Sequence, residues 1–235
     1  MAVRLEDLAK TIDQTLPDPD ARPDELTALC RRARDVHVAG VCVPTSRVRA
    51  ASQELQGSDV KVCALVGFPS GRARTQVKLA EARRALEDGA GELEFVLNVA
   101  ALRSGDARLV LEELVSLVRM VRLGSANGGR GAVLLKAVLG TRLLDDRMKK
   151  LAAKIVELAE VDFAQTGTGY GTASATMHDV ELLRECLPEH VGVKACGGVE
   201  SFADVVALID AGAARIGSAA AVEILEPATP LATAR

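Results

Sequence analysis

The sequence predicts a (β/α)8 barrel, because short apolar segments alternate with longer amphipathic segments along 235 residues. The short segments are rich in Val, Leu and Ile, as expected for parallel strands that are covered on both faces. We expect eight strands, at Thr11–Thr15, Gly40–Val43, Val60–Val66, Glu92–Leu97, Ala132–Leu139, Val161–Gln165, Val191–Ala195 and Ala214–Gly217. The first strand is the least regular of these, and without it an open doubly wound sheet is the alternative.

The segments between the expected strands carry apolar residues at helical spacing. The stripes are Leu26, Leu29, Cys30 and Ala33; Val110, Leu114, Leu117, Val118 and Val121; Met148, Leu151, Ala152 and Ile155; and Phe202, Val205, Val206 and Ile209. We therefore expect a single barrel domain over residues 1–225. Residues 226–235 contain two prolines and no stripe, which predicts a flexible C-terminal tail.

Composition and charge exclude several function classes. The net charge is -3 and aromatic residues make up 2% of the chain, which argues against a nucleic-acid partner. The charged stretch Arg72–Arg84 is accordingly expected to be a solvated helix face. We expect no signal peptide and no membrane span, since no apolar run is long enough to cross a bilayer.

The cysteines and histidines show no metal-ligand or triad spacing. Five cysteines without a CxxC pair favour buried free thiols in a reducing cytosol, so a cytoplasmic protein is expected. His37, His178 and His190 lie on or beside expected helices, where surface or packing roles are predicted.

Polar residues occur where a barrel lumen would otherwise be apolar. Leu93, Phe95 and Leu97 form the bulky face of the fourth expected strand, so Glu94 should point inward. The same alternation places Lys136, Gln165 and Lys194 near the carboxyl ends of three further strands. Barrel active sites are built at that end.

We therefore predict a catalytic group made of Lys194, Glu94, Lys136 and Gln165. Like charge and burial would depress the pKa of a lysine in such a cluster, which makes a nucleophilic or basic amine. The alternative interpretation is a buried ion-pair network that only stabilises the barrel.

Glycine-rich turns follow the last three expected strands. Their residues include Thr166, Gly167, Thr168, Gly169 and Tyr170; then Gly197 and Gly198; and then Gly217 and Ser218. Backbone N–H groups in such turns can hold a phosphate or carboxylate, so these residues are predicted to bind substrate.

Several motifs resemble those of the deoxyribose-phosphate aldolase family. They include Ile12-Asp-Gln-Thr-Leu16, Val41-Cys-Val43, Val60-Lys-Val-Cys-Ala-Leu-Val-Gly-Phe-Pro69 and Gly192-Val-Lys-Ala-Cys-Gly-Gly198, and the resemblance runs in order from about Ile12 to Leu225. It implies a (β/α)8 barrel that joins acetaldehyde to glyceraldehyde 3-phosphate, or splits the product. The family does this through a lysine Schiff base, without metal or other cofactor, and commonly as a homodimer.

The chain departs from the family pattern at the position that matters most. The nucleophilic lysine of the sixth strand is replaced by Gln165, and an amide cannot form an imine with an aldehyde. The usual Asp of the fourth strand is Glu94, and the usual His of the first-strand motif is Gln14, beside a retained Asp13. Two family lysines are retained, as Lys136 and Lys194.

The family's phosphate site is also altered. Its Ser-Ser pair is Ala219-Ala220 here, which leaves Gly217 and Ser218 with fewer donors for an anion. Tyr170, in the loop after the sixth strand, is a further candidate to contact substrate or supply a proton, and Asp13 and Gln14 complete the predicted substrate-binding set.

Three hypotheses follow from this combination. The first is an aldolase-like lyase for a small carbonyl substrate with altered chemistry. In it Lys194, or as the second choice Lys136, is the amine nucleophile, Glu94 moves protons, and Gln165 hydrogen-bonds a substrate carbonyl or hydroxyl. In a non-covalent variant, Lys194 and Gln165 stabilise an enolate electrostatically. The second is a non-catalytic ligand-binding relative. The third is ordinary deoxyribose-phosphate aldolase activity through a relocated lysine.

Overall fold

The chain folds into a closed barrel of eight parallel strands, in the computed structural model of residues 5–16, 18, 20–128, 132–171 and 175–225. Each strand pairs with the next one in sequence, and β8 closes the ring by pairing with β1. The predicted (β/α)8 barrel is therefore confirmed, and the open-sheet alternative is wrong. The predicted tail, 226–235, lies outside the described residues.

The strands occur where the apolar segments predict them, with ends shifted by at most two residues. They are β1 (Ile12–Thr15), β2 (Gly40–Pro44), β3 (Lys61–Val66), β4 (Glu92–Val96), β5 (Leu134–Val138), β6 (Phe163–Gln165), β7 (Gly192–Cys196) and β8 (Arg215–Ser218). Register pairs Glu94 with Lys136 and Gln165 with Lys194 across neighbouring strands. The four expected polar residues thus form two neighbouring pairs, and the register places Lys136 opposite Phe163, two residues before Gln165.

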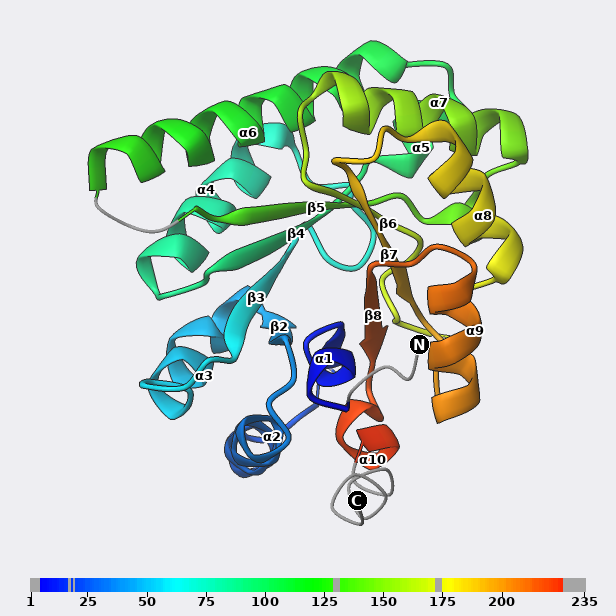
Figure 1. The fold of residues 1–235 in the computed structure, drawn as a ribbon. Coiled ribbons are helices and arrows are strands. Elements are labelled where there is room, and N and C mark those ends of the chain that lie inside the picture. Colours follow the sequence, from blue (N-terminus) through cyan, green and yellow to red (C-terminus); the bar gives the residue numbers. More distant parts are fainter. Residues whose placement is uncertain (1–4, 17, 19, 129–131, 172–174, 226–235) are drawn as a thin grey trace.

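Helices surround the strands (Figure 1). They are α1 (Leu5–Ala9), α2 (Pro23–Asp35), α3 (Val48–Glu54), α4 (Thr75–Glu87), α5 (Val99–Arg103), α6 (Ala107–Gly128), α7 (Asp146–Leu158), α8 (Met177–Cys186), α9 (Phe202–Asp210) and α10 (Ala221–Leu225), with 3₁₀ turns η1 (Thr45–Arg47) and η2 (Thr141–Leu143). Side-chain caps begin several of them: Asp145 accepts from the N–H of Met148 at α7, and Ser201 from that of Asp204 at α9.

The apolar stripes of the helices pack on the barrel with three exceptions. Leu151 on α7 is 41% exposed, and on α9 Phe202 and Val206 are 46% and 38% exposed. In α9, Val205 and Leu208 are buried instead. The apolar pattern of α9 is wider than the surface that the barrel can cover, so part of it faces solvent.

The charged stretch Arg72–Arg84 is not a uniformly solvated face. Lys78 on α4 is fully buried, and its Nζ lies 3.0 Å from Glu113 Oε2 and donates to the carbonyl of Val96 at 3.1 Å. Its ammonium also lies 4.7 Å from the ring centre of Phe95. This buried pair ties α4 and α6 to the end of β4.

In the described part of the chain, no helix has the length and apolar character needed to span a membrane. His37 and His178 are exposed and contact Asp59 and Asp146, at 3.0 Å and 2.9 Å, so both lie away from the lumen as predicted.

Candidate active site

Two lysines share one carboxylate in the barrel lumen. Lys194 Nζ on β7 lies 2.5 Å from Asp13 Oδ2 on β1, and Lys136 Nζ on β5 lies 2.9 Å from the same oxygen. All three side chains have no exposed surface. The alternation rule therefore placed both lysines correctly on the inner face of their strands.

Glu94 connects this pair to the residue at the family's nucleophile position. Its Oε1 lies 2.6 Å from Lys194 Nζ, and its Oε2 accepts from Gln165 Nε2 at 3.0 Å. The second N–H of Gln165 donates to the carbonyl of Gly167 at 2.7 Å. Since both neighbours are acceptors, the amide orientation is fixed, and Gln165 Oε1 is buried without a hydrogen-bond partner among the described residues.

Two further lumen charges were not predicted as site residues. Glu92 Oε2 lies 2.5 Å from Lys136 Nζ, and its Oε1 lies 3.2 Å from Arg215 on β8. Arg215 also contacts Asp13 Oδ1 at 3.2 Å. The alternation of side chains along a strand could have predicted that both point into the lumen, because Glu92 shares a face with Glu94, and Arg215 shares a face with Gly217.

The lumen cluster is balanced in charge, with three carboxyl groups and three cations. Its members are Asp13, Glu92, Glu94, Lys136, Lys194 and Arg215. An isolated buried charge costs several kcal/mol, roughly, so such a set is stable in the lumen only because each charge has an opposite partner.

The ion pairs with lumen carboxylates shift the pKa values of both lysines upward, opposite to the predicted direction. Burial alone lowers the pKa of Lys194, but the carboxylates of Asp13 and Glu94 outweigh it and raise that pKa well above its ordinary value. The pKa of Lys136 is also raised, since burial is outweighed chiefly by Asp13. The expected depressed lysine is therefore wrong in this structure: both amines are held as ammonium ions.

The carboxylates respond in the opposite sense. Burial alone raises the pKa of Glu94, yet Lys194 and Lys136 bring it down to about 2. The pKa of Asp13 is lowered too, because Lys136, Lys194 and Arg215 together outweigh its burial. Glu94 is thus ionised at neutral pH and accepts hydrogen bonds, while its basicity is low.

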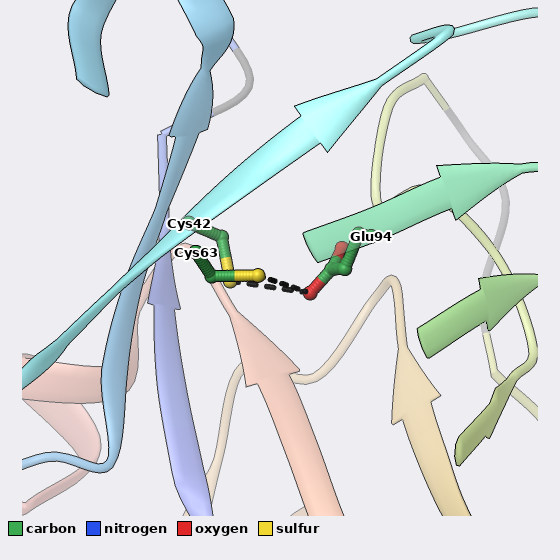
Figure 2. A group of neighbouring side chains, drawn as sticks. All are labelled: Cys42, Cys63 and Glu94. Carbon is green, nitrogen blue, oxygen red and sulfur yellow. Dashed lines mark hydrogen bonds between the residues drawn. The ribbon is translucent and has the colours of Figure 1, made fainter. Parts of the chain in front are cut away.

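Cys42 and Cys63 direct their sulfur atoms toward Glu94 (Figure 2). The Sγ atoms donate to Glu94 Oε1 at 3.2 Å and 3.5 Å, and all three candidate ligand atoms lie within 4.8 Å of one another. However, Lys194 Nζ is 3.6 Å from one sulfur and Lys136 Nζ 3.8 Å from the other. Burial also raises the pKa of the Cys63 thiol, which keeps it protonated. The set does not fit a resident metal ion, because a cation here would meet two ammonium groups and a neutral thiol.

Two of the cavities at the carboxyl ends of the strands contain the predicted turn residues. The first, of about 360 Å³, is lined by Thr166, Gly167, Thr168 and Tyr170 among others. Tyr170 is 43% exposed and meets Phe68 edge to face, with ring centres 5.6 Å apart. These four predicted substrate-binding residues thus face one space.

The second cavity, of about 670 Å³, contains the other predicted turn residues. Gly169, Gly197, Gly198, Gly217 and Ser218 all line it, so the structure brings the glycine turns together as expected. The hydroxyl of Ser218, however, donates to the Val199 carbonyl and accepts from the N–H of Ala220.

Gln14 lies apart from both cavities and from the lumen cluster. Its amide donates to the carbonyl of Ala219 and accepts from the N–H of Val222, which binds the start of α10 to β1. Its side chain therefore has a structural contact where the sequence predicted a substrate contact.

Comparisons with known proteins agree with this architecture. The chain is 40% identical over 222 residues to a deoxyribose-phosphate aldolase of Caldanaerobacter subterraneus subsp. tengcongensis, with 94% of each chain covered. It is 41% identical over 219 residues to one from Streptococcus pneumoniae, covering 93% of this chain and 96% of that one. The chain belongs to the deoxyribose-phosphate aldolase family.

Solved structures place the family in the same fold. An aldolase described as QR15 superposes with a TM-score of 0.88 at 31% identity, covering 95% of this chain and 96% of that one. The deoxyribose phosphate aldolase of Aeropyrum pernix, described as a unique tetramer, has a TM-score of 0.85 at 33% identity, covering 97% and 93%. No protein-family model matches the chain.

The deoxyribose-phosphate aldolase family consists of aldehyde-lyases. The resemblance of the motifs implies a lysine at position 165, and the structure shows Gln165 hydrogen-bonded to Glu94 at the level of Lys194. The remaining amines, on Lys136 and Lys194, are buried ammonium ions.

Proposed function

We propose that this protein is an aldolase-type carbon–carbon lyase for a small carbonyl compound, whose chemistry does not run through an imine at position 165. The observation that carries the proposal is Gln165 itself, which is fully buried and hydrogen-bonded to Glu94 in a lumen that also holds Lys136 and Lys194. An amide nitrogen has no available lone pair for attack on a carbonyl, so this side chain binds rather than reacts.

The ionic state of the lumen favours electrostatic over covalent catalysis. An imine on Lys194 requires the ammonium to lose a proton and to leave carboxylate oxygens at 2.5 Å and 2.6 Å. Stabilising the negative charge of an enolate requires neither step, because the positive charge is already present and fixed. Lys194 is accordingly assigned the role of a fixed cation below the reacting group.

Gln165 adds a constraint on the bound molecule. Both of its N–H groups are engaged, so its buried Oε1 can only accept a hydrogen bond. A hydroxyl group of the substrate supplies such a donor, whereas a carbonyl oxygen does not. In an aldol, the hydroxyl group on the carbon next to the carbon–carbon bond that breaks is such a donor.

Borohydride trapping separates the two mechanisms. The protein is incubated with acetaldehyde and borohydride, and adducts are mapped by mass spectrometry while aldol cleavage is assayed without borohydride. We expect turnover without an adduct on Lys194 or Lys136. A reduced adduct on either lysine would overturn the electrostatic mechanism and favour the relocated-lysine hypothesis.

A non-catalytic relative is the second candidate, and the completeness of the ion pairing favours it. Each lumen charge has an opposite partner within 3.2 Å, as a purely structural network would. A thermal-shift screen of small carbonyl compounds distinguishes this candidate: binding without conversion supports it, and conversion excludes it. The homodimer and the cytoplasmic location stay predictions.

A further inference from the structure

Three arginines line the cavity of about 360 Å³ above strands β4 to β7. Arg72 precedes α4, Arg103 ends α5, and Arg142 lies in η2, so three separate segments converge on one space. None of the described residues that line it is an aspartate or a glutamate. The wall of this cavity is therefore positive.

The floor of the same cavity lies directly over the lumen cluster. Val96 follows Glu94 by two residues on β4, and Cys196 follows Lys194 by two residues on β7; both line the cavity. Because alternate residues of a strand share a face, these side chains are the next layer above the two charged ones. A molecule in the cavity therefore rests above the proposed reacting groups.

The glycine-lined cavity has the opposite electrostatic character. Its described lining includes Glu200 and Glu223 and no lysine, arginine or histidine. Glu223 is paired with Arg32 at 2.8 Å, outside the cavity, while Ser218 uses its one hydroxyl proton on the Val199 carbonyl. This cavity therefore offers backbone N–H groups but no cation to an anion.

We propose that the cavity above β4 to β7 binds a carboxylate or phosphate group of the substrate through Arg72 and Arg103. The substrate is then a small carbonyl compound that carries one anionic group, held at the arginine cavity rather than at the glycine turns. Guanidinium groups suit this role because their fork of donors matches both oxyanions. That the bound molecule is a substrate depends on the proposed function, whereas the binding of an anion in this cavity does not.

Isothermal titration calorimetry on the full chain tests the site without relying on turnover. The probes are glyceraldehyde 3-phosphate, succinate semialdehyde and neutral glyceraldehyde. We expect at least one anionic probe to bind at least about tenfold more tightly than glyceraldehyde, with an affinity that falls as salt is added. The tighter anionic probe identifies phosphate or carboxylate as the group recognised.

Matched variants locate the binding. Arg72→Gln and Arg103→Gln should each weaken binding of the anionic probe by about tenfold, a typical effect for one charged hydrogen-bond partner. Arg83→Gln, which changes an exposed arginine of α4 outside the cavity, should leave it unchanged. Glu200→Gln should also leave it unchanged.

Two results overturn the inference: wild-type affinity in both arginine variants, or tighter binding in Glu200→Gln, which would place the anion at the glycine turns. The proposed function fails separately. Arginine-dependent binding without any carbon–carbon cleavage refutes the lyase alone, whereas cleavage of neutral and anionic substrates at equal rates, with no arginine dependence, refutes the anion site alone.

Discussion

Replacing Lys194 by methionine removes one cation from the lumen at nearly constant volume. In the wild type the Nζ atom lies 2.5 Å from Asp13 and 2.6 Å from Glu94, and all three side chains are buried. Removing one partner of a buried ion pair costs about 3–5 kcal/mol, because the remaining charges are left without compensation. We expect Lys194→Met to lower the free energy of unfolding at pH 7 by this amount.

The loss should depend on pH in a defined direction. The pKa of Glu94 is about 2 against an ordinary 4.5, which corresponds to about 3 kcal/mol of stability, present above pH 4.5 and lost as pH falls toward 2. Without Lys194 the pKa of Glu94 rises, so protonation relieves the buried charge at a higher pH. The difference between variant and wild type should therefore shrink between pH 7 and pH 4.

Guanidinium denaturation followed by circular dichroism at both pH values measures this difference. Lys61→Met, at an exposed position of β3, is the control and should change stability by less than about 0.5 kcal/mol. If Lys194→Met fails to fold at pH 7, the double variant with Glu94→Gln restores charge balance and should fold. A Lys194→Met protein as stable as the control, or equally destabilised at both pH values, would refute the reasoning.

Three further changes test other parts of the structure. Gln165→Lys places an amine beside Glu94, and we expect a borohydride-trappable adduct at 165 and new cleavage of 2-deoxyribose 5-phosphate; absence of the adduct would show that the pocket differs in more than its nucleophile. Gly71→Ala, at φ +67°, would bring a Cβ to within 2 Å of a backbone carbonyl oxygen, so the free energy of unfolding should fall by about 3 kcal/mol or more. Gly105→Ala, at φ +85° but with open space around the Cβ, is the control and should cost about 1 kcal/mol. Equal melting temperatures of the two variants would contradict this. Lys78→Met should cost about 3 kcal/mol because it leaves the buried Glu113 carboxylate without its cation and with only the Thr75 hydroxyl as a donor. Adding Glu113→Gln should recover part of the loss in denaturation curves.

The sequence predicted the strands well for a physical reason. Strands buried on both faces consist of short runs of Val, Leu and Ile, and runs of this length between amphipathic segments are too short to be buried helices. The helix faces were less certain: Phe202 and Val206 fit the helical spacing but lie at the solvent edge of a wide apolar pattern. Periodicity alone does not say which edge of a wide pattern meets the sheet.

The candidate site was predictable in position and not in electrostatics. Alternation along single strands brought Glu94, Lys136 and Lys194 inward, because the period of a strand is fixed. The sign of the lysine pKa shifts depends on every partner across the lumen, and the pattern of a single strand does not reveal that Asp13 and Glu92 are among those partners. The arginine cavity escaped prediction since its cations come from three separate loops and helix ends.

The distribution of the lumen charges along the chain couples folding to barrel closure. Asp13, Glu92 and Glu94 all precede Gly128, and Lys136, Lys194 and Arg215 all follow it. Within the described lumen cluster, the N-terminal half thus contributes only acids and the C-terminal half contributes only bases. The lumen charges of one half can be neutralised only by those of the other half. Closure of the barrel and neutralisation of the lumen charges are therefore one cooperative event.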